Sequence, residues 1–91
     1  MIIEELYKII EDRKKSMPKN SYVASLFQEG MDKIIQKIGE ESTEVIIAAK
    51  NESKQRVISE VSDLLFHILI ILSYLGIKPS DIYKELNKRK K

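Results

Sequence analysis

The chain has no cysteine and no tryptophan, and it contains one histidine, three glycines and two prolines. Without cysteine it can form neither a disulfide nor a thiolate metal site, which fits a reducing compartment. A single histidine leaves little for zinc or copper to bind. Because glycine and proline are so few, the positions where they occur mark the boundaries between segments.

Long hydrophobic runs and a strong excess of one charge are also missing. The longest apolar run, 64–72, is interrupted by His67 and is far shorter than the ~20 residues that a membrane span needs. The first three residues lead directly into acidic ones, unlike a signal peptide, and a net charge of +2 does not favour nucleic acid as a partner. We therefore expect a cytoplasmic protein that binds neither membrane nor nucleic acid.

Apolar residues recur at helical spacing along nearly all 91 residues, a length that fits one domain spanning 1–91. The third and fourth predicted helices, 31–50 and 54–75, are the longest, and the fourth is apolar around most of its second half. A single short chain can hardly cover such a helix on every side. We expect an all-α helical bundle of about four to five helices, completed by homodimerisation.

The remaining boundaries follow from caps and breakers. The first helix should start near Ile2 and end before Pro18, and the second should run over 21–29 with Ser21 as its N-cap. Residues 51–53 should form a turn. The fourth helix should stop at Gly76, and a short closing helix should follow Pro79 and Ser80.

Four acids on the two longest helices lie beside the apolar stripes. At about 100° per residue, Glu41 falls inside the apolar arc of 31–50 and Glu44 lies at its edge, whereas Glu40 points further toward solvent. On 54–75, Glu60 and Asp63 are three residues apart and share one face that borders the apolar arc.

A carboxylate on a core-facing stripe is costly to bury unless something compensates its charge, and a hard divalent cation does so for several converging ones. For each acid taken alone, an exposed salt bridge is the alternative, with Lys37–Glu41 and Arg56–Glu60 as obvious pairs. For the acids taken together we favour an Mg²⁺ site, whose ligands would be Glu41, Glu44, Glu60 and Asp63.

Other polar residues flank these acids. We expect His67, one turn beyond Asp63, to orient a metal-bound carboxylate rather than to bind the metal itself. Lys37 and Lys50 are candidates for phosphate binding, although lysines at helix edges are often only solvated. Weaker candidates for substrate binding are Arg13, Ser21 and Tyr22.

The acidic pattern is similar to a known signature. Residues 40–44 (EESTE) followed by 60–63 (EVSD) resemble the E-E-x-x-E … E-x-x-D motif of the all-α, MazG-like nucleoside triphosphate pyrophosphohydrolases. Within that superfamily the chain resembles the phosphoribosyl-ATP pyrophosphohydrolases over essentially its whole length. The segments that carry this second resemblance are 21–22, 37–41, 45–50 and 63–67.

The resemblance implies a homodimeric enzyme that uses Mg²⁺ to hydrolyse the α–β phosphoanhydride of phosphoribosyl-ATP. The products would be phosphoribosyl-AMP and pyrophosphate, in the second step of histidine biosynthesis. It also implies that Glu40 is an outer ligand or positions water, so that the catalytic candidates are Glu40, Glu41 and Glu44. Some relatives are fused to a cyclohydrolase with cysteine-bound zinc; with no cysteine, this chain should be the stand-alone form.

Two other functions remain open. The acids act on the triphosphate and not on the base, so another (deoxy)nucleoside triphosphate is an alternative substrate. From a different class, the chain could be a non-catalytic helical dimerisation module, which would bind no Mg²⁺ and release no pyrophosphate.

Overall fold

The computed structural model describes residues 1–51 and 53–90, which form five helices and no strand. The expected all-α fold is confirmed. Two ends differ from expectation: Asn51 is still helical, and the last helix begins at Pro79 itself, while Glu52 of the expected turn lies outside the described residues. The helices are α1 (Ile2–Ser16), α2 (Tyr22–Glu29), α3 (Met31–Asn51), α4 (Lys54–Leu75) and α5 (Pro79–Lys88).

Capping groups explain where several helices begin and end. The Ser21 hydroxyl accepts a hydrogen bond from the Ala24 N–H at 3.1 Å, which confirms Ser21 as the N-cap of α2. Gly76 ends α4 in the left-handed conformation with φ of 74°, which a residue without a Cβ adopts at little cost. At α5, the Lys78 N–H donates to the Asp81 carboxylate at 3.0 Å. Pro79 can be the first residue of this helix because the N–H that it lacks would have no partner within the helix.

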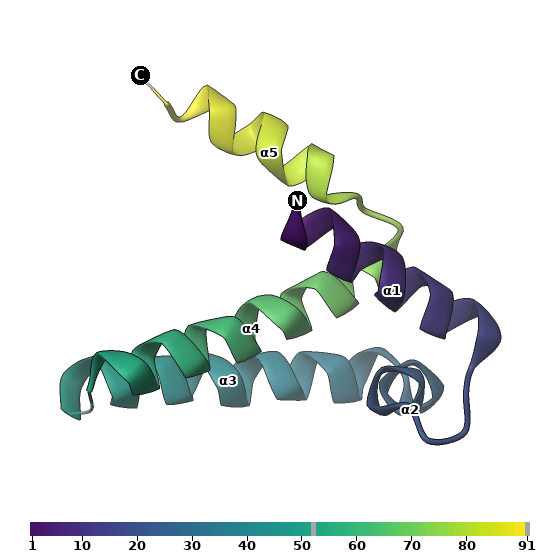
Figure 1. Cartoon of the computed structure of the whole chain (residues 1–91), viewed down its shortest axis with the longest axis horizontal. Helices are drawn as coiled ribbons and strands as arrows, with labels where there is room; N and C mark the ends of the chain where they lie inside the picture. The colour runs from purple at the N-terminus through teal and green to yellow at the C-terminus, as the bar shows by residue number, and fades with distance from the viewer. Residues whose placement is uncertain (52, 91) are drawn as a thin grey trace.

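Helices α3 and α4 lie side by side in opposite directions and form the longest packed pair (Figure 1). Helix α2 lies across the start of α3, and α1 packs against α2 and against the second half of α4. Helix α5 extends away from the other four and touches mainly α1. The chain is therefore an open arrangement of helices built on the α3–α4 pair.

The buried core is small and lies where four helices meet. Its side chains come from α1, α2, the start of α3 and the end of α4, and several partly buried residues pack around them. The stretch of the α3–α4 pair between this core and the connection of the two helices carries the acids. The buried core residues are Ile10, Val23, Leu26, Ile34, Leu69 and Ile70.

One polar cluster ties α1 to the end of α4. Ser73 is fully buried, and its hydroxyl donates to the Glu11 carboxylate, a bond that lowers the pKa of Glu11. The Lys14 ammonium lies 3.0 Å from the same carboxylate and donates to the Ser73 carbonyl at 2.8 Å. These groups satisfy one another, as polar atoms at a helix contact must.

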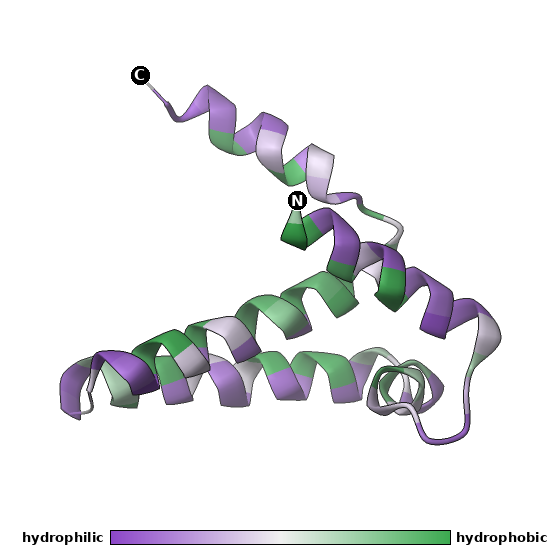
Figure 2. Ribbon diagram, in the orientation of Figure 1, coloured by the Kyte–Doolittle hydropathy of each residue, from purple (hydrophilic) through white to green (hydrophobic). Residues whose placement is uncertain are grey.

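Helix α4 leaves much of its apolar surface uncovered. Only 28% of its most apolar 18-residue window is buried inside the chain, and Ile58, Leu65 and Leu75 are exposed. The ribbon of its second half is apolar nearly throughout (Figure 2). The incomplete cover agrees with the expectation that a single short chain can hardly surround this helix. One expectation is corrected: the apolar run at 64–72 is short, but the whole of α4 is long and apolar enough, by length and composition alone, to cross a membrane.

Candidate metal centre and active site

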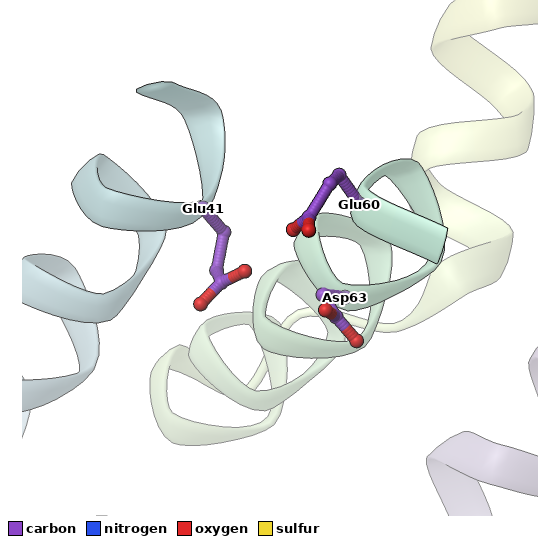
Figure 3. A group of neighbouring side chains, drawn as sticks. All are labelled: Glu41, Glu60 and Asp63. Atoms are coloured by element: carbon purple, nitrogen blue, oxygen red, sulfur yellow. The ribbon is translucent and has the colours of Figure 1, made fainter. Parts of the chain in front are cut away.

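Three carboxylates from two helices converge on one point. Glu41 projects from α3 toward Glu60 and Asp63 on α4 (Figure 3). Each of the three offers an oxygen atom, and these oxygens all lie within 4.8 Å of one another. We call Glu41, Glu60 and Asp63 the acidic cluster.

The antiparallel pairing of α3 and α4 explains why these residues meet. Glu41 and Asp63 are at equal distances along the chain from position 52, which lies in the connection between the helices. The same is true of Glu44 and Glu60. Since both helices rise by the same 1.5 Å per residue, residues at equal distances come to lie opposite each other.

Glu60 is the most buried carboxylate of the cluster, with 7% of its surface exposed. Among the described residues it pairs with Arg56 at 3.0 Å, and the Arg56 side chain is half exposed. The Lys37 ammonium lies 3.8 Å from Glu41. Both ion pairs that were expected if the acids only form salt bridges are therefore present. Their acids, Glu41 and Glu60, nevertheless also converge from two helices. An ion pair with one half-exposed cation compensates a buried carboxylate only weakly.

The acidic cluster fits a hard divalent cation. It offers oxygen ligands alone, from both sides of the helix pair, as Mg²⁺ prefers. Two oxygens on one Mg²⁺ lie about 3–4 Å apart, given metal–oxygen bonds of about 2.0–2.1 Å. A small closure of the carboxylates would therefore bring all three within reach of one ion.

The other two acids of the motif lie beside the cluster. Glu44 is half-buried on α3, but among the described residues it does not share the group formed by the other three. Glu40 is exposed, as expected; it accepts a hydrogen bond from the Gln36 amide at 2.9 Å and pairs with Lys37 at 3.3 Å. These two contacts lower the pKa of Glu40, and the Glu40 contact raises that of Lys37.

The single histidine, His67, lies one helical turn after Asp63 on α4. His67 is buried, and its Nδ1 lies 2.7 Å from the backbone carbonyl oxygen of Asp63 rather than from the Asp63 carboxylate. Its Nε2 lies 2.7 Å from the Tyr22 hydroxyl. The sequence marked both Tyr22 and His67 as candidates, but no pattern in it indicated that they touch.

The comparison with protein families decides the family. The family described as phosphoribosyl-ATP pyrophosphohydrolase matches residues 3–90. The chain belongs to the phosphoribosyl-ATP pyrophosphohydrolase family. The resemblance to this family, drawn from segments 21–22, 37–41, 45–50 and 63–67, is thereby confirmed.

Relatives named phosphoribosyl-ATP pyrophosphatase match this family member over nearly its whole length. That of Geobacter sulfurreducens is 49% identical over 88 residues, covering 97% of this chain and 82% of the relative. That of Clostridium novyi is 50% identical over 90 residues, covering 99% and 82%. That of Saccharolobus solfataricus is 47% identical over 90 residues, covering 99% and 96%.

The other residues predicted to bind phosphate or substrate in this pyrophosphohydrolase family member have no described contact with the acidic cluster or form another hydrogen bond. The Ser21 hydroxyl is occupied as the cap of α2. Arg13, at the end of α1, pairs with Asp12 at 3.1 Å. Lys50 is exposed in the last turn of α3, about 13 Å along the helix from Glu41. Of the cationic candidates, the structure brings Lys37 alone into contact with a cluster acid through a described ion pair.

Proposed function

We propose that the chain is an Mg²⁺-dependent hydrolase of phosphoribosyl-ATP, acting as a single domain over 1–91. It would cleave the α–β phosphoanhydride to phosphoribosyl-AMP and pyrophosphate in histidine biosynthesis. The convergence of Glu41, Glu60 and Asp63, in a member of this family, is the observation that carries the proposal. The names of relatives at about half identity support the choice of substrate.

The residues divide the work of the reaction among them. Mg²⁺ bound by the acidic cluster, with Glu44 as a further ligand, would neutralise the negative charge that develops on the phosphoanhydride. Glu40 is exposed and its pKa is lowered, so it stays ionised and can accept a hydrogen bond from the attacking water and orient it. Lys37, whose pKa is raised, stays charged beside Glu40 and Glu41 and can bind a phosphate oxygen.

A substrate panel tests this choice against the other members of the superfamily. With Mg²⁺ present, we expect pyrophosphate release from phosphoribosyl-ATP with a kcat/KM at least about tenfold above that for ATP or any deoxynucleoside triphosphate, a difference of about 1.4 kcal/mol in transition-state binding. Faster turnover of a deoxynucleoside triphosphate would assign the other substrate class. No release from any nucleotide would favour a dimerisation module.

We further propose that the chain works as a homodimer, because one copy alone is too open. Its radius of gyration is 14.2 Å, whereas a compact chain of this length has about 12 Å. Its accessible surface is 6656 Å², against about 5,500 Å² for a monomer of this mass. The excess is larger than the about 800 Å² that each partner buries in a standard interface.

The surface that a second copy would cover is an apolar groove between α1, α4 and α5. The groove has a volume of about 280 Å³ and is lined by aliphatic and aromatic side chains and a proline. The groove continues the exposed apolar face of α4, so we propose that a second copy of the chain occupies it rather than lipid or nucleic acid. We also propose that the protein is cytoplasmic. Its lining residues are Ile3, Leu65, Ile68, Leu69, Leu72, Pro79, Ile82, Tyr83 and Leu86.

Placing a charge in this groove should separate the two copies. Leu65 is 46% exposed in the groove, and Ile9 on α1 is 47% exposed outside it, which makes Ile9 a matched control. We expect Leu65→Glu to raise the dimer dissociation constant at least about a hundredfold, because it desolvates an unpaired charge at an apolar contact. Sedimentation equilibrium measures this; a wild-type monomer, or equal effects of Leu65→Glu and Ile9→Glu, would contradict the proposed interface.

A further inference from the structure

One hydrogen bond joins α2 to α4 at the edge of the acidic cluster. The Tyr22 hydroxyl lies 2.7 Å from Nε2 of His67, which sits one turn beyond Asp63. The two rings meet edge to face, with centroids 5.7 Å apart and planes at 83°. His67 is 6% exposed whereas Tyr22 is 49% exposed, so a buried group holds a side chain that faces solvent.

The partners of His67 define which ring nitrogen carries the proton. Nδ1 lies 2.7 Å from the Asp63 carbonyl oxygen, which can only accept a hydrogen bond. The Nδ1 atom must therefore be the donor. In the neutral ring Nε2 is then an acceptor, and the Tyr22 hydroxyl must donate to it. Burial raises the pKa of the Tyr22 phenol, which keeps the proton that this bond requires.

This bond has consequences for the rim of the site. Tyr22 is the first residue of α2, so fixing its hydroxyl also fixes the start of that helix against α4. Because the phenol donates its only O–H to His67, its oxygen can take part in other hydrogen bonds only as an acceptor. The charge of Lys37 lowers the pKa of the Tyr22 phenol and the charges of Glu41, Glu40 and Asp63 raise it, so the phenol lies within the electric field of these groups.

We propose that Tyr22 and His67 form a positioning pair for the reaction. Through the Nδ1–H tautomer, His67 holds the Tyr22 ring and the start of α2 at the rim of the acidic cluster, where they position Lys37 and the nucleotide. This inference rests on the proposed function for its kinetic part, but its structural part can be tested without any substrate.

Histidine NMR tests the structural part directly. The chain has one histidine, so the imidazole signals need no assignment. In mildly alkaline buffer, long-range ¹H–¹⁵N spectra should show a neutral ring protonated at Nδ1. In Tyr22→Phe, which keeps the ring and removes the hydroxyl, the Nε2 signal should shift, and amide exchange should accelerate in the first turn of α2 but not in α4. An Nε2–H tautomer in the wild type, or unchanged exchange in α2, would overturn the proposal.

Kinetics test the positioning role. We expect Tyr22→Phe to lower kcat/KM for phosphoribosyl-ATP about tenfold, as removal of residues that orient a metal site does. The rise of the melting temperature on adding Mg²⁺ should be retained. Tyr74→Phe is the control, because Tyr74 is 42% exposed and stacks on Phe27, about 16 Å along α4 from Asp63.

The outcomes separate this inference from the proposed function. Wild-type kcat/KM in Tyr22→Phe, or an equal loss in Tyr74→Phe, would overturn the positioning role. If the wild-type protein releases no pyrophosphate from phosphoribosyl-ATP, the proposed function fails. The tautomer and the exchange rates of α2 then still decide whether the pair holds the helix in place.

Discussion

Glu41→Gln and Asp63→Asn are each expected to lower the turnover of phosphoribosyl-ATP by at least about a thousandfold, while the helical circular dichroism spectrum stays unchanged. The two residues face each other from α3 and α4 and supply oxygens within 4.8 Å. An amide keeps the shape of the side chain but removes the charge that binds Mg²⁺. Steady-state assays of pyrophosphate release measure the loss.

Controls for these variants should carry the same chemical change elsewhere. Glu85→Gln on α5 and Asp32→Asn in the first turn of α3 alter exposed acids outside the cluster. Both should keep turnover within about twofold of the wild type, since exposed charges contribute little to a distant site. Near-normal turnover in both Glu41→Gln and Asp63→Asn would show that the acidic cluster is not the metal site.

Addition of Mg²⁺ should raise the melting temperature by on the order of 10 °C. An ion that binds the folded state alone at a hundred times its dissociation constant contributes about 2.7 kcal/mol, and about 1 kcal/mol shifts a domain of this size by about 4–8 °C. The physical source is relief of repulsion among three close carboxylates, one of them buried. Differential scanning fluorimetry across an Mg²⁺ titration measures the shift.

Glu60→Gln tests whether this stabilisation comes from the cluster. In the absence of metal, two effects on its melting temperature should oppose each other: loss of the ion pair with the half-exposed Arg56, worth about 0–1 kcal/mol, and relief of repulsion from Glu41 and Asp63. The shift on adding Mg²⁺ should disappear, whereas Glu85→Gln should retain it. If Mg²⁺ leaves the wild-type melting temperature unchanged, the acids form salt bridges and no metal site.

The helices were predictable because their signals are local. Ser21 and Gly76 are a side-chain cap and a left-handed stop, and each acts within one turn of its own helix. Periodicity also placed Glu40 correctly toward solvent, because the direction of a side chain relative to its own helix depends only on residue spacing. The start of α5 was misplaced because proline is accepted as the first residue of a helix.

The relations between helices were harder to predict. Spacing marked Glu41 as the acid least compatible with its surroundings, but Glu60 is the more deeply buried, because burial depends on which neighbour covers a face. The Tyr22–His67 bond joins residues 45 positions apart and leaves no periodic trace. The sequence does contain one signal for the acidic cluster that we did not use. Glu41 and Asp63 are at equal distances along the chain from position 52, so they must lie opposite each other if the two helices pack antiparallel.

The coverage of α4 is the part of the architecture that one chain cannot supply. Its apolar second half predicted burial on nearly every side, yet Leu65 and Leu75 remain exposed. The physical reason is that a chain of this length has too few other helices to surround one of 22 residues. The apolar pattern led us to expect that a single chain would not cover this helix, and the exposed leucines agree with that expectation, whereas the second copy stays a prediction.

We propose above that the acidic cluster between α3 and α4 supports Mg²⁺-dependent hydrolysis of phosphoribosyl-ATP. The most direct test is to incubate the wild-type protein with phosphoribosyl-ATP and to quantify products with Mg²⁺, with excess chelator, and after Mg²⁺ is restored. We expect equal amounts of phosphoribosyl-AMP and pyrophosphate with Mg²⁺, no products with chelator, and recovery on restoration. No products with Mg²⁺, or the same rate with chelator, would contradict it.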